Sequence, residues 1–276
     1  MTTSQLIFIP GQPRLAADSC GDGPLLVFMH GIGGNRSNWQ DQLPAFGAHF
    51  RAVAWDARGY GASDDYEGAL DFGADFSADL LRTLDHLGAR KSILCGLSMG
   101  GRIAQAFFDR HPARVAAMVL CDTAADFTTD LSAAQRAEFV RLRKAPLLAG
   151  GEPRDIAPVV ARTLMGPQAT PAHMQRLIDS MSALHKESYL KAIDASYGDS
   201  ARRLKPLSSI DVPVLLVYGA DDTLTPPALG RAMQAAIAGA QFIEIAAAGH
   251  LCNIEAPALF NRAVLAFALK HRHLAA

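Results

Sequence analysis

One serine of this chain lies in a sequence context in which its hydroxyl could act as a nucleophile. Ser98 is the middle residue of Gly96-Leu97-Ser98-Met99-Gly100, which fits the pattern G-x-S-x-G. Directly before it comes an apolar segment typical of a strand, and a segment typical of a helix follows. A turn this tight leaves no room for side chains two residues before and two after the serine, so glycine is needed there. The pattern predicts a nucleophilic Ser98; a glycine-rich turn without a catalytic role is the alternative.

A serine hydroxyl is a weak nucleophile and needs a base to take its proton and a third group to orient that base. Of the nine histidines, only His250 directly follows a predicted late strand, so His250 is the candidate base. Three aspartates could supply the orienting carboxylate. Asp221 and Asp222 follow one late strand, and Asp122 follows an earlier strand. The spacing alone does not choose among them.

A glycine-rich turn, His30-Gly31-Ile32-Gly33-Gly34, follows another predicted strand. Such a turn can aim a backbone N–H at the negative oxygen that forms when a serine attacks a carbonyl group. The N–H of the residue after the nucleophile can join it. The expected donors are therefore the backbone N–H groups of Ile32 and Met99. His30 itself is expected to order the turn rather than to transfer a proton.

The elements that would position these residues alternate along the chain. Short apolar runs predict strands over 24–30, 51–58, 91–96, 115–123, 212–219 and 241–246. The first four runs are nearly continuous in apolar residues, as expected for strands that are covered on both faces. Helices are predicted over 75–88, 100–111, 228–237 and 257–270. This alternation predicts an α/β fold with a mostly parallel sheet flanked by helices.

The middle of the chain differs from both ends. From about residue 125 to 206 there is no good strand, only helical stretches over 132–148, 156–165 and 171–184 that glycine and proline separate. We therefore predict a core domain formed by residues 1–124 and 207–276. Residues 125–206 are predicted to form a helical cap, or lid, inserted before the late strands.

The predicted cap helices carry more apolar side chains than they could bury against each other. These residues are Phe139, Leu142, Leu147, Leu148, Leu164, Met165, Met174, Leu177 and Met181. We expect them to cover Ser98 and to form part of the wall of an apolar pocket. The alternative for Met165, Met174 and Met181 is that they form a small core of the cap itself. Arg141, Arg143 and Lys144 on the first cap helix could attract a substrate carboxylate, although a solvated basic face is the favoured interpretation.

Composition and charge exclude several classes of protein. Hydrophobic residues make up 50% and charged residues 19% of the chain, which argues against disorder. A net charge of −1 without long charged runs argues against nucleic acid or an anionic membrane as a partner. No apolar stretch approaches the roughly 20 residues of a membrane span. Four scattered cysteines and the lack of a signal sequence predict a cytoplasmic protein, and no metal or organic cofactor is expected.

Beyond these patterns, the chain resembles the α/β-hydrolase superfamily of the fold-1 type over nearly its whole length outside residues 125–206. Besides the turns at Ser98 and His30, residues 56–63 (DARGYGAS) are similar to the D-x-R-G-x-G-x-S loop of that family. The acid loop of the family reads G-x-x-D-x-x-x-P, and Gly219, Asp222 and Pro226 fit this register. The resemblance therefore implies that Asp222 is the acid and Asp221 a neighbour.

Four segments are most similar to the 3-oxoadipate enol-lactone hydrolases. They are residues 96–101 (GLSMGG), 120–125 (LCDTAA), 192–195 (AIDA) and 249–257 (GHLCNIEAP). One residue departs from what such a substrate would favour, because Asp126 stands where a basic side chain would suit an anionic molecule.

The resemblance and the residue patterns together predict a serine hydrolase with Ser98, His250 and Asp222 as its triad. Its substrate would be a small carboxylic ester or lactone, for which 3-oxoadipate enol-lactone is a candidate, cleaved through an acyl-enzyme. A C–C bond hydrolase or an amidase on the same triad is the alternative among enzymes. From another class, a non-catalytic receptor that keeps the pocket is also considered.

Overall fold

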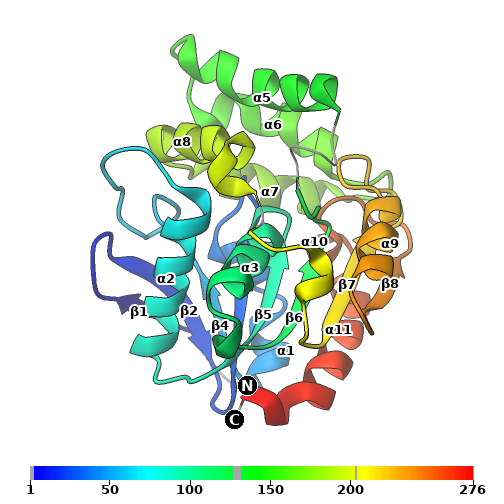
Figure 1. Cartoon of the computed structure of the whole chain (residues 1–276). Helices are drawn as coiled ribbons and strands as arrows, with labels where there is room; N and C mark the ends of the chain where they lie inside the picture. Colours follow the sequence, from blue (N-terminus) through cyan, green and yellow to red (C-terminus); the bar gives the residue numbers. More distant parts are fainter. Residues whose placement is uncertain (1–2, 127–131, 203, 276) are drawn as a thin grey trace.

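The structure, a computed structural model, describes residues 3–126, 132–202 and 204–275 of the chain. Over these residues the strands form one eight-stranded sheet of order β1-β2-β4-β3-β5-β6-β7-β8 (Figure 1). The strands are β1 Gln5–Ile9, β2 Leu15–Cys20, β3 Leu25–Met29, β4 Arg51–Trp55, β5 Ser92–Leu97, β6 Val115–Cys121, β7 Val214–Gly219 and β8 Gln241–Ile245. β2 pairs antiparallel with β1 and with β4, and all other neighbours are parallel. The predicted mostly parallel sheet is therefore confirmed.

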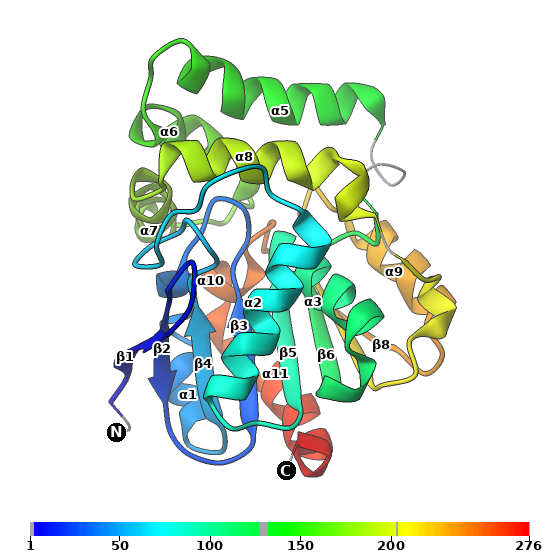
Figure 2. The same cartoon turned by 60° about the vertical axis from the view of Figure 1, so that its left-hand side comes forward.

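Helices cover both faces of this sheet. α2 and α3 pack on one face, and α1 and α11 lie on the other (Figures 1 and 2). The helices are α1 Leu43–Gly47, α2 Phe72–His86, α3 Met99–Arg110, α5 Ala133–Leu148, α6 Pro153–Leu164, α7 Pro171–Ser182, α8 Lys186–Tyr197, α9 Pro227–Ala236, α10 Cys252–Glu255 and α11 Pro257–His271. Because of this double cover, every residue of β3, β5, β6 and β7 is buried, which explains their unbroken apolar sequences.

The sequence patterns missed the antiparallel strands β1 and β2 and the helices α1, α8 and α10. β1 and β2 form an antiparallel pair at one edge of the sheet, and β1 is mostly exposed. Its sequence, QLIFI, lacks the regular alternation that indicates a half-buried strand. The short helices α1 and α10 were also missed, because one turn of helix carries too few residues to show a 3.6-residue period.

Four helices, α5 to α8, gather at the end of the sheet where the parallel strands finish (Figures 1 and 2). They occupy most of the predicted cap, of which residues 127–131 and 203 lie outside the described part of the chain. Polar contacts join them to loops of the sheet. From α7, Arg176 donates to the carbonyl of Asn38 at 3.0 Å, and from α8, Lys191 donates to the carbonyl of Tyr66 at 2.7 Å.

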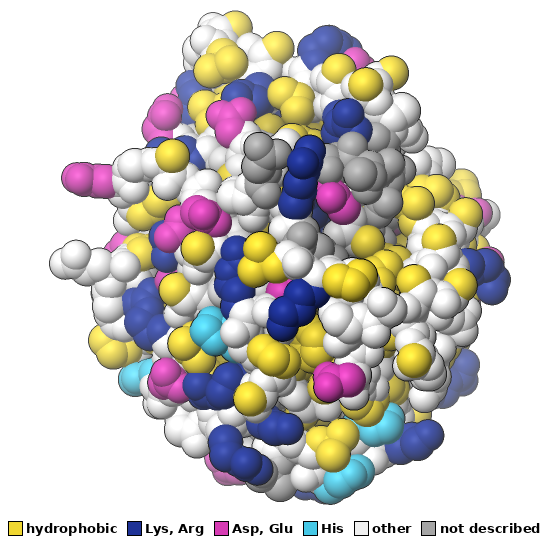
Figure 3. Space-filling model, in the orientation of Figure 1, with side chains coloured by type: hydrophobic (Ala, Val, Ile, Leu, Met, Phe, Trp, Pro, Cys, Tyr) yellow, Lys and Arg dark blue, Asp and Glu magenta, His cyan; other side chains and the backbone are white. Residues whose placement is uncertain are grey.

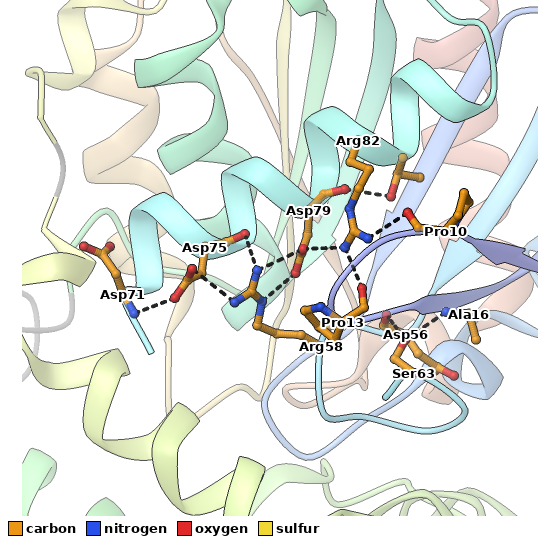
Figure 4. A network of polar contacts seen from close by, with 12 residues as sticks. Pro10, Pro13, Ala16, Asp56, Arg58, Ser63, Asp71, Asp75, Asp79 and Arg82 are labelled. Carbon is orange, nitrogen blue, oxygen red and sulfur yellow. Dashed lines mark hydrogen bonds and ion pairs between the residues drawn. The ribbon is translucent and has the colours of Figure 1, made fainter. Parts of the chain in front are cut away.

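A buried carboxylate on α2 anchors two arginines (Figure 4). Asp79 is 2% exposed and accepts hydrogen bonds from Arg58 at 2.7 and 3.0 Å and from Arg82 at 2.8 Å. Arg82 also donates to the carbonyl groups of Pro10 and Pro13. Through this one carboxylate, α2 holds the loop after β4 and the chain between β1 and β2.

The face of the molecule drawn in Figure 3 carries positive and negative side chains interspersed with apolar ones. Cys95 and Cys121 are fully buried inside β5 and β6. Within the described residues, no helix combines the length and the apolar character that crossing a membrane requires.

We predict that Asp79→Asn lowers the free energy of unfolding by about 2 kcal/mol, because Arg82 loses its carboxylate partner and Arg58 keeps only that of Asp75. Urea denaturation measures the effect. Asp85→Asn on the same helix is the matched control, since the Asp85 side chain is 59% exposed and pairs with Arg114 at the surface. It should cost less than about 1 kcal/mol. Equal losses in the two variants would contradict the anchoring role of Asp79.

Candidate active site

Ser98 is the single residue between the end of β5 and the start of α3. Its backbone has φ of 53° and ψ of −111°, a left-handed conformation that costs a residue with a side chain about 1–3 kcal/mol. Hydrogen bonds hold the residue in this conformation. Its N–H donates to the carbonyl of Cys121 at 2.9 Å, and its carbonyl accepts from the Thr123 hydroxyl at 2.7 Å. The turn thus presents the Ser98 side chain at the carboxyl edge of the sheet.

The two glycines of the motif, Gly96 and Gly100, are needed because the turn leaves no space for a side chain at either position. A Cβ atom added to Gly96 would collide with the backbone of Gly100, and one added to Gly100 would collide with the carbonyl of Met29. Both obstacles are backbone atoms, which cannot move aside as a flexible side chain could. The steric reason inferred from the sequence therefore holds for both glycines.

His250 and Asp222 form a buried pair. Nδ1 of His250 lies 2.8 Å from Oδ2 of Asp222, and the two residues are 3% and 4% exposed. The backbone N–H groups of Leu224 and Thr225 donate to Oδ1 of Asp222 at 2.8 and 3.1 Å. The Thr225 hydroxyl donates to Oδ2 at 2.7 Å. These donors satisfy the carboxylate, and the carboxylate orients the imidazole.

The pair also shifts the protonation of both partners. Burial by itself lowers the pKa of His250, but the charge and the hydrogen bond of Asp222 outweigh it and raise that pKa above 6.5. Burial raises the pKa of Asp222, yet His250 and the donors of Thr225 bring it below its usual value. The arrangement therefore favours a carboxylate beside an imidazole that readily accepts a proton.

The other two aspartates proposed from the sequence do not pair with His250. Asp221 is exposed, and its N–H donates to the carbonyl of Ala248. Asp122 is buried at the end of β6 and accepts from the Gly219 N–H at 2.7 Å. Burial and the nearby Asp222 raise the pKa of Asp122 and so favour its neutral form. Of the three, Asp222 is the one that the structure pairs with His250.

The glycine-rich turn after β3 lies against the serine. A Cβ atom added to Gly31 would lie 3.5 Å from Cβ of Ser98. Among the described residues, no acceptor takes a hydrogen bond from the backbone N–H of Ile32 or of Met99. Nε2 of His30 accepts from the Ala57 N–H at 3.1 Å, so the proton is on Nδ1, which donates to the Gly31 carbonyl at 2.8 Å. Two N–H groups thus remain available for an oxyanion, while His30 orders the turn.

A narrow cavity of about 30 Å³ connects these groups. Its lining includes Ser98, His250 and Ile32 from the sheet side and, from α5 to α7, Phe139, Arg143, Leu164 and Leu177. The Ser98 hydroxyl faces this cavity and makes no hydrogen bond to His250 within the described residues. Catalytic hydrogen bonds of ligand-free sites are often formed only when the substrate binds. The groups present could perform proton transfer, nucleophilic attack and oxyanion stabilisation at one carbonyl carbon.

Sequence reasoning did not single out two residues that support His250. The Thr225 hydroxyl lies 2.7 Å from Asp222 and 3.2 Å from Nδ1 of His250. The Glu255 carboxylate accepts from the N–H groups of Gly249, at 3.0 Å, and Gly166, at 2.8 Å. Both lie inside motifs used for the resemblance, Thr225 beside Pro226 and Glu255 in GHLCNIEAP. Their contacts with loops distant in sequence could not be inferred.

The structure corrects two expectations for the cap helices. Arg143 is not part of a solvated basic face, because it is 3% exposed and lines the cavity of Ser98. Arg141 on the same helix is exposed, as expected. Of the predicted apolar wall, Phe139, Leu164 and Leu177 line the cavity, whereas Leu148 is 69% exposed. Met181, fully buried, lies instead against Gly33 of the glycine-rich turn.

Comparisons with known proteins show the family to which the chain belongs. The family described as alpha/beta hydrolase fold matches residues 24–257. The 3-oxoadipate enol-lactonase 2 of Acinetobacter baylyi is 30% identical over 88% of both chains. Among solved structures, a malate-bound esterase from Thermogutta terrifontis has a TM-score of 0.83 at 28% identity, covering 97% of this chain and 99% of that one. An enol-lactonase from Burkholderia xenovorans has a TM-score of 0.78 at 28% identity. The match covers 96% of this chain and 100% of the enol-lactonase chain.

We predict that NMR titration of His250 gives a pKa above 6.5 and that Asp222→Asn lowers it, because the neutral amide no longer stabilises the imidazolium. Asp221→Asn is the control and should leave the titration of His250 nearly unchanged. A larger shift of the His250 pKa in Asp221→Asn than in Asp222→Asn would mean that the acid has been misassigned.

Proposed function

The chain belongs to the α/β-hydrolase fold family and is a hydrolase, and on that premise we propose that it cleaves a small carboxylic ester or lactone with Ser98 as nucleophile. One observation carries the proposal. The buried pair of His250 and Asp222 opens onto the same cavity as Ser98, beside two backbone N–H groups without acceptors. The predicted hydrolase class and the resemblance to enol-lactonases are confirmed by the relatives, whereas the roles of individual residues are our proposal.

In the proposed mechanism, Nε2 of His250 takes the proton of the Ser98 hydroxyl as the oxygen attacks the carbonyl carbon. The negative oxygen of the tetrahedral intermediate accepts hydrogen bonds from the N–H groups of Ile32 and Met99. Asp222 stabilises the imidazolium through Nδ1. His250 then gives its proton to the departing alkoxide, which leaves an acyl-serine. Water, deprotonated by His250, attacks this ester in turn and releases the acid and Ser98.

The electrostatics of the pair suit these steps. Because Asp222 raises the pKa of His250, the imidazole is a stronger base toward the serine hydroxyl. Asp222, fully hydrogen-bonded and charged, supports the imidazolium as it forms without being protonated itself. The positive φ of Ser98 and the donors around Asp222 keep these groups in place before the substrate arrives. Such preorganised groups need little rearrangement in the transition state.

The names of the relatives narrow the substrate class. The similar proteins from Acinetobacter baylyi and Burkholderia xenovorans are named enol-lactonases, and the one from Thermogutta terrifontis is named an esterase. We therefore propose an ester or a lactone as the substrate, with 3-oxoadipate enol-lactone as the specific lactone to test first. Both classes carry the carbonyl carbon and the alkoxide or enolate leaving group that the mechanism uses.

We also propose that residues 125–206 act as a cap on the core formed by residues 1–124 and 207–276. Phe139, Leu164 and Leu177 come from this segment and line the cavity of Ser98. An apolar cover excludes water and so strengthens the hydrogen bonds to the oxyanion. The cap would thereby set both the rate and the size of the acyl group.

Ser98→Ala should lower kcat by about 10⁴-fold or more on 4-nitrophenyl acetate, because only binding and oxyanion contacts remain. The second readout is covalent labelling by a fluorophosphonate, located by mass spectrometry on Ser98 in the wild type and absent from the variant. If Ser98→Ala keeps a tenth of the wild-type rate, the serine mechanism is wrong.

Leu177→Ala should widen the acyl pocket if the cap shapes the site. We expect the ratio of kcat/KM for 4-nitrophenyl hexanoate to that for the acetate to rise about tenfold, the effect of accommodating about one further methylene group. Leu148→Ala is the matched control in the same segment, since Leu148 is 69% exposed and does not line the cavity. An unchanged ratio in Leu177→Ala would argue against the cap as a determinant of substrate size.

A further inference from the structure

A positive charge lies buried beside the candidate nucleophile. Arg143 on α5 is 3% exposed, and its side chain lines the same cavity as Ser98 and His250. The guanidinium is close enough to His250 for its charge to act against protonation of the imidazole. Arg143 therefore belongs to the surroundings of the reacting groups rather than to the surface of α5.

Unlike its neighbours on α5, Arg143 has no carboxylate partner within the described residues. Arg141 pairs with Glu138 at 2.8 Å, and Lys144 pairs with Asp194. Arg143 instead stacks on the Phe139 ring, 3.6 Å from its centre, and donates from Nη1 to the Phe139 carbonyl at 3.3 Å. The Tyr189 hydroxyl helps to support its charge. Nε of Arg143, although buried, has no acceptor in the described chain.

Such a charge is not explained by stability. Burial lowers the pKa of Arg143, but an arginine remains protonated in proteins, so the charge persists in the cavity. A buried cation without a counter-ion is unfavourable compared with an apolar side chain of similar size. The unfavourable arrangement is relieved when an anion with two oxygens approaches the planar guanidinium, which can donate two parallel hydrogen bonds.

Arg143 also stands where a ligand could extend from the cavity. An outer groove between α5, α6 and the loop at Thr223 is lined by Phe139, Arg143, Leu164 and Leu224, all of which also line the inner cavity. The one acid in the lining of this groove, among the described residues, is Glu138, which Arg141 already pairs. The shared wall is thus apolar except for the guanidinium.

We propose that Arg143 binds a free carboxylate of the substrate, so that the enzyme prefers esters or lactones that carry a second, unesterified carboxyl group. This inference rests on the proposed serine mechanism, because the carboxylate and the reacting carbonyl must belong to one molecule. The Ser98 side of the cavity holds the carbonyl, and Arg143 holds the anionic end. Arg143 is thereby a specificity-determining residue, whereas Arg141 and Lys144 on the same helix are not.

The test uses matched ester pairs on the full-length protein. The anionic substrates are the mono-4-nitrophenyl esters of succinic, glutaric and adipic acids, which sample the reach to Arg143. The neutral partner of each has the free carboxyl converted to its methyl ester. We expect wild-type kcat/KM to favour the anionic member of at least one pair by about tenfold or more. Arg143→Gln should lower that anionic value by about 30-fold or more and change the neutral value by less than about threefold.

Two further variants separate binding from structure. Arg143→Lys keeps the charge but loses the planar fork, so it should recover only part of the preference. Arg141→Gln, on the exposed face of the same helix, should behave as the wild type. Arg143→Gln should melt at the same temperature as the wild type or higher, since it removes an unpaired buried charge. A lower melting temperature together with equal losses on anionic and neutral esters would overturn the proposal in favour of a structural role.

Glutarate itself tests the binding site without turnover. Calorimetry should detect its binding to the wild type and a loss of about 30-fold or more in affinity with Arg143→Gln. Equal affinity in the two proteins, or wild-type kcat/KM equal for anionic and neutral esters, would overturn the proposal. Fluorophosphonate labelling of Ser98 reports the serine mechanism separately. A protein that labels and hydrolyses neutral esters without preferring anionic ones disproves the role of Arg143 alone.

Discussion

The backbone of Ser98 is held in a left-handed conformation between the end of β5 and the start of α3, and hydrogen bonds from the next strand keep it there. This constraint determines much of what surrounds it. The two glycines of the motif are required because the turn brings their Cα atoms against other backbone atoms. The same turn leaves the N–H of Met99 without an acceptor at the start of α3, where the dipole of the helix favours negative charge. The strained conformation of one residue therefore leaves the Ser98 hydroxyl and the N–H of Met99 next to each other at the carboxyl edge of the sheet.

Two buried charges near this turn, on Asp222 and Arg143, differ in how completely they are hydrogen-bonded. Every oxygen of Asp222 has donors from Leu224, Thr225 or His250, so the carboxylate is stable without any ligand. Arg143 keeps a buried Nε without an acceptor in the described chain. A satisfied charge can orient a neighbour permanently, whereas an unsatisfied charge gains most when a complementary group arrives. The first arrangement suits a fixed part of the catalytic machinery, and the second suits recognition of a ligand.

Hydrogen bonds connect the segment over the cavity to the loop that carries His250. The N–H of His250 donates to the carbonyl of Leu164 at the end of α6, and Glu255 bridges Gly166 and Gly249. A displacement of α6 would therefore also displace the backbone of His250. The apolar lining from this segment and the position of His250 are consequently coupled through these few hydrogen bonds.

The sequence by itself determined the α/β class, the six strands β3 to β8 to within a few residues, and the set of candidate groups. It did so because unbroken apolar runs and glycine spacing are local consequences of burial and of a tight turn. It identified Asp222 over Asp221 and Asp122 only through resemblance. Tertiary structure decided which carboxylate meets His250, since that contact joins loops after β7 and β8. It also decided that Arg143 is buried and Arg141 exposed. Both lie on one helix with similar sequence surroundings, and only the packing of α5 against the rest of the fold distinguishes them.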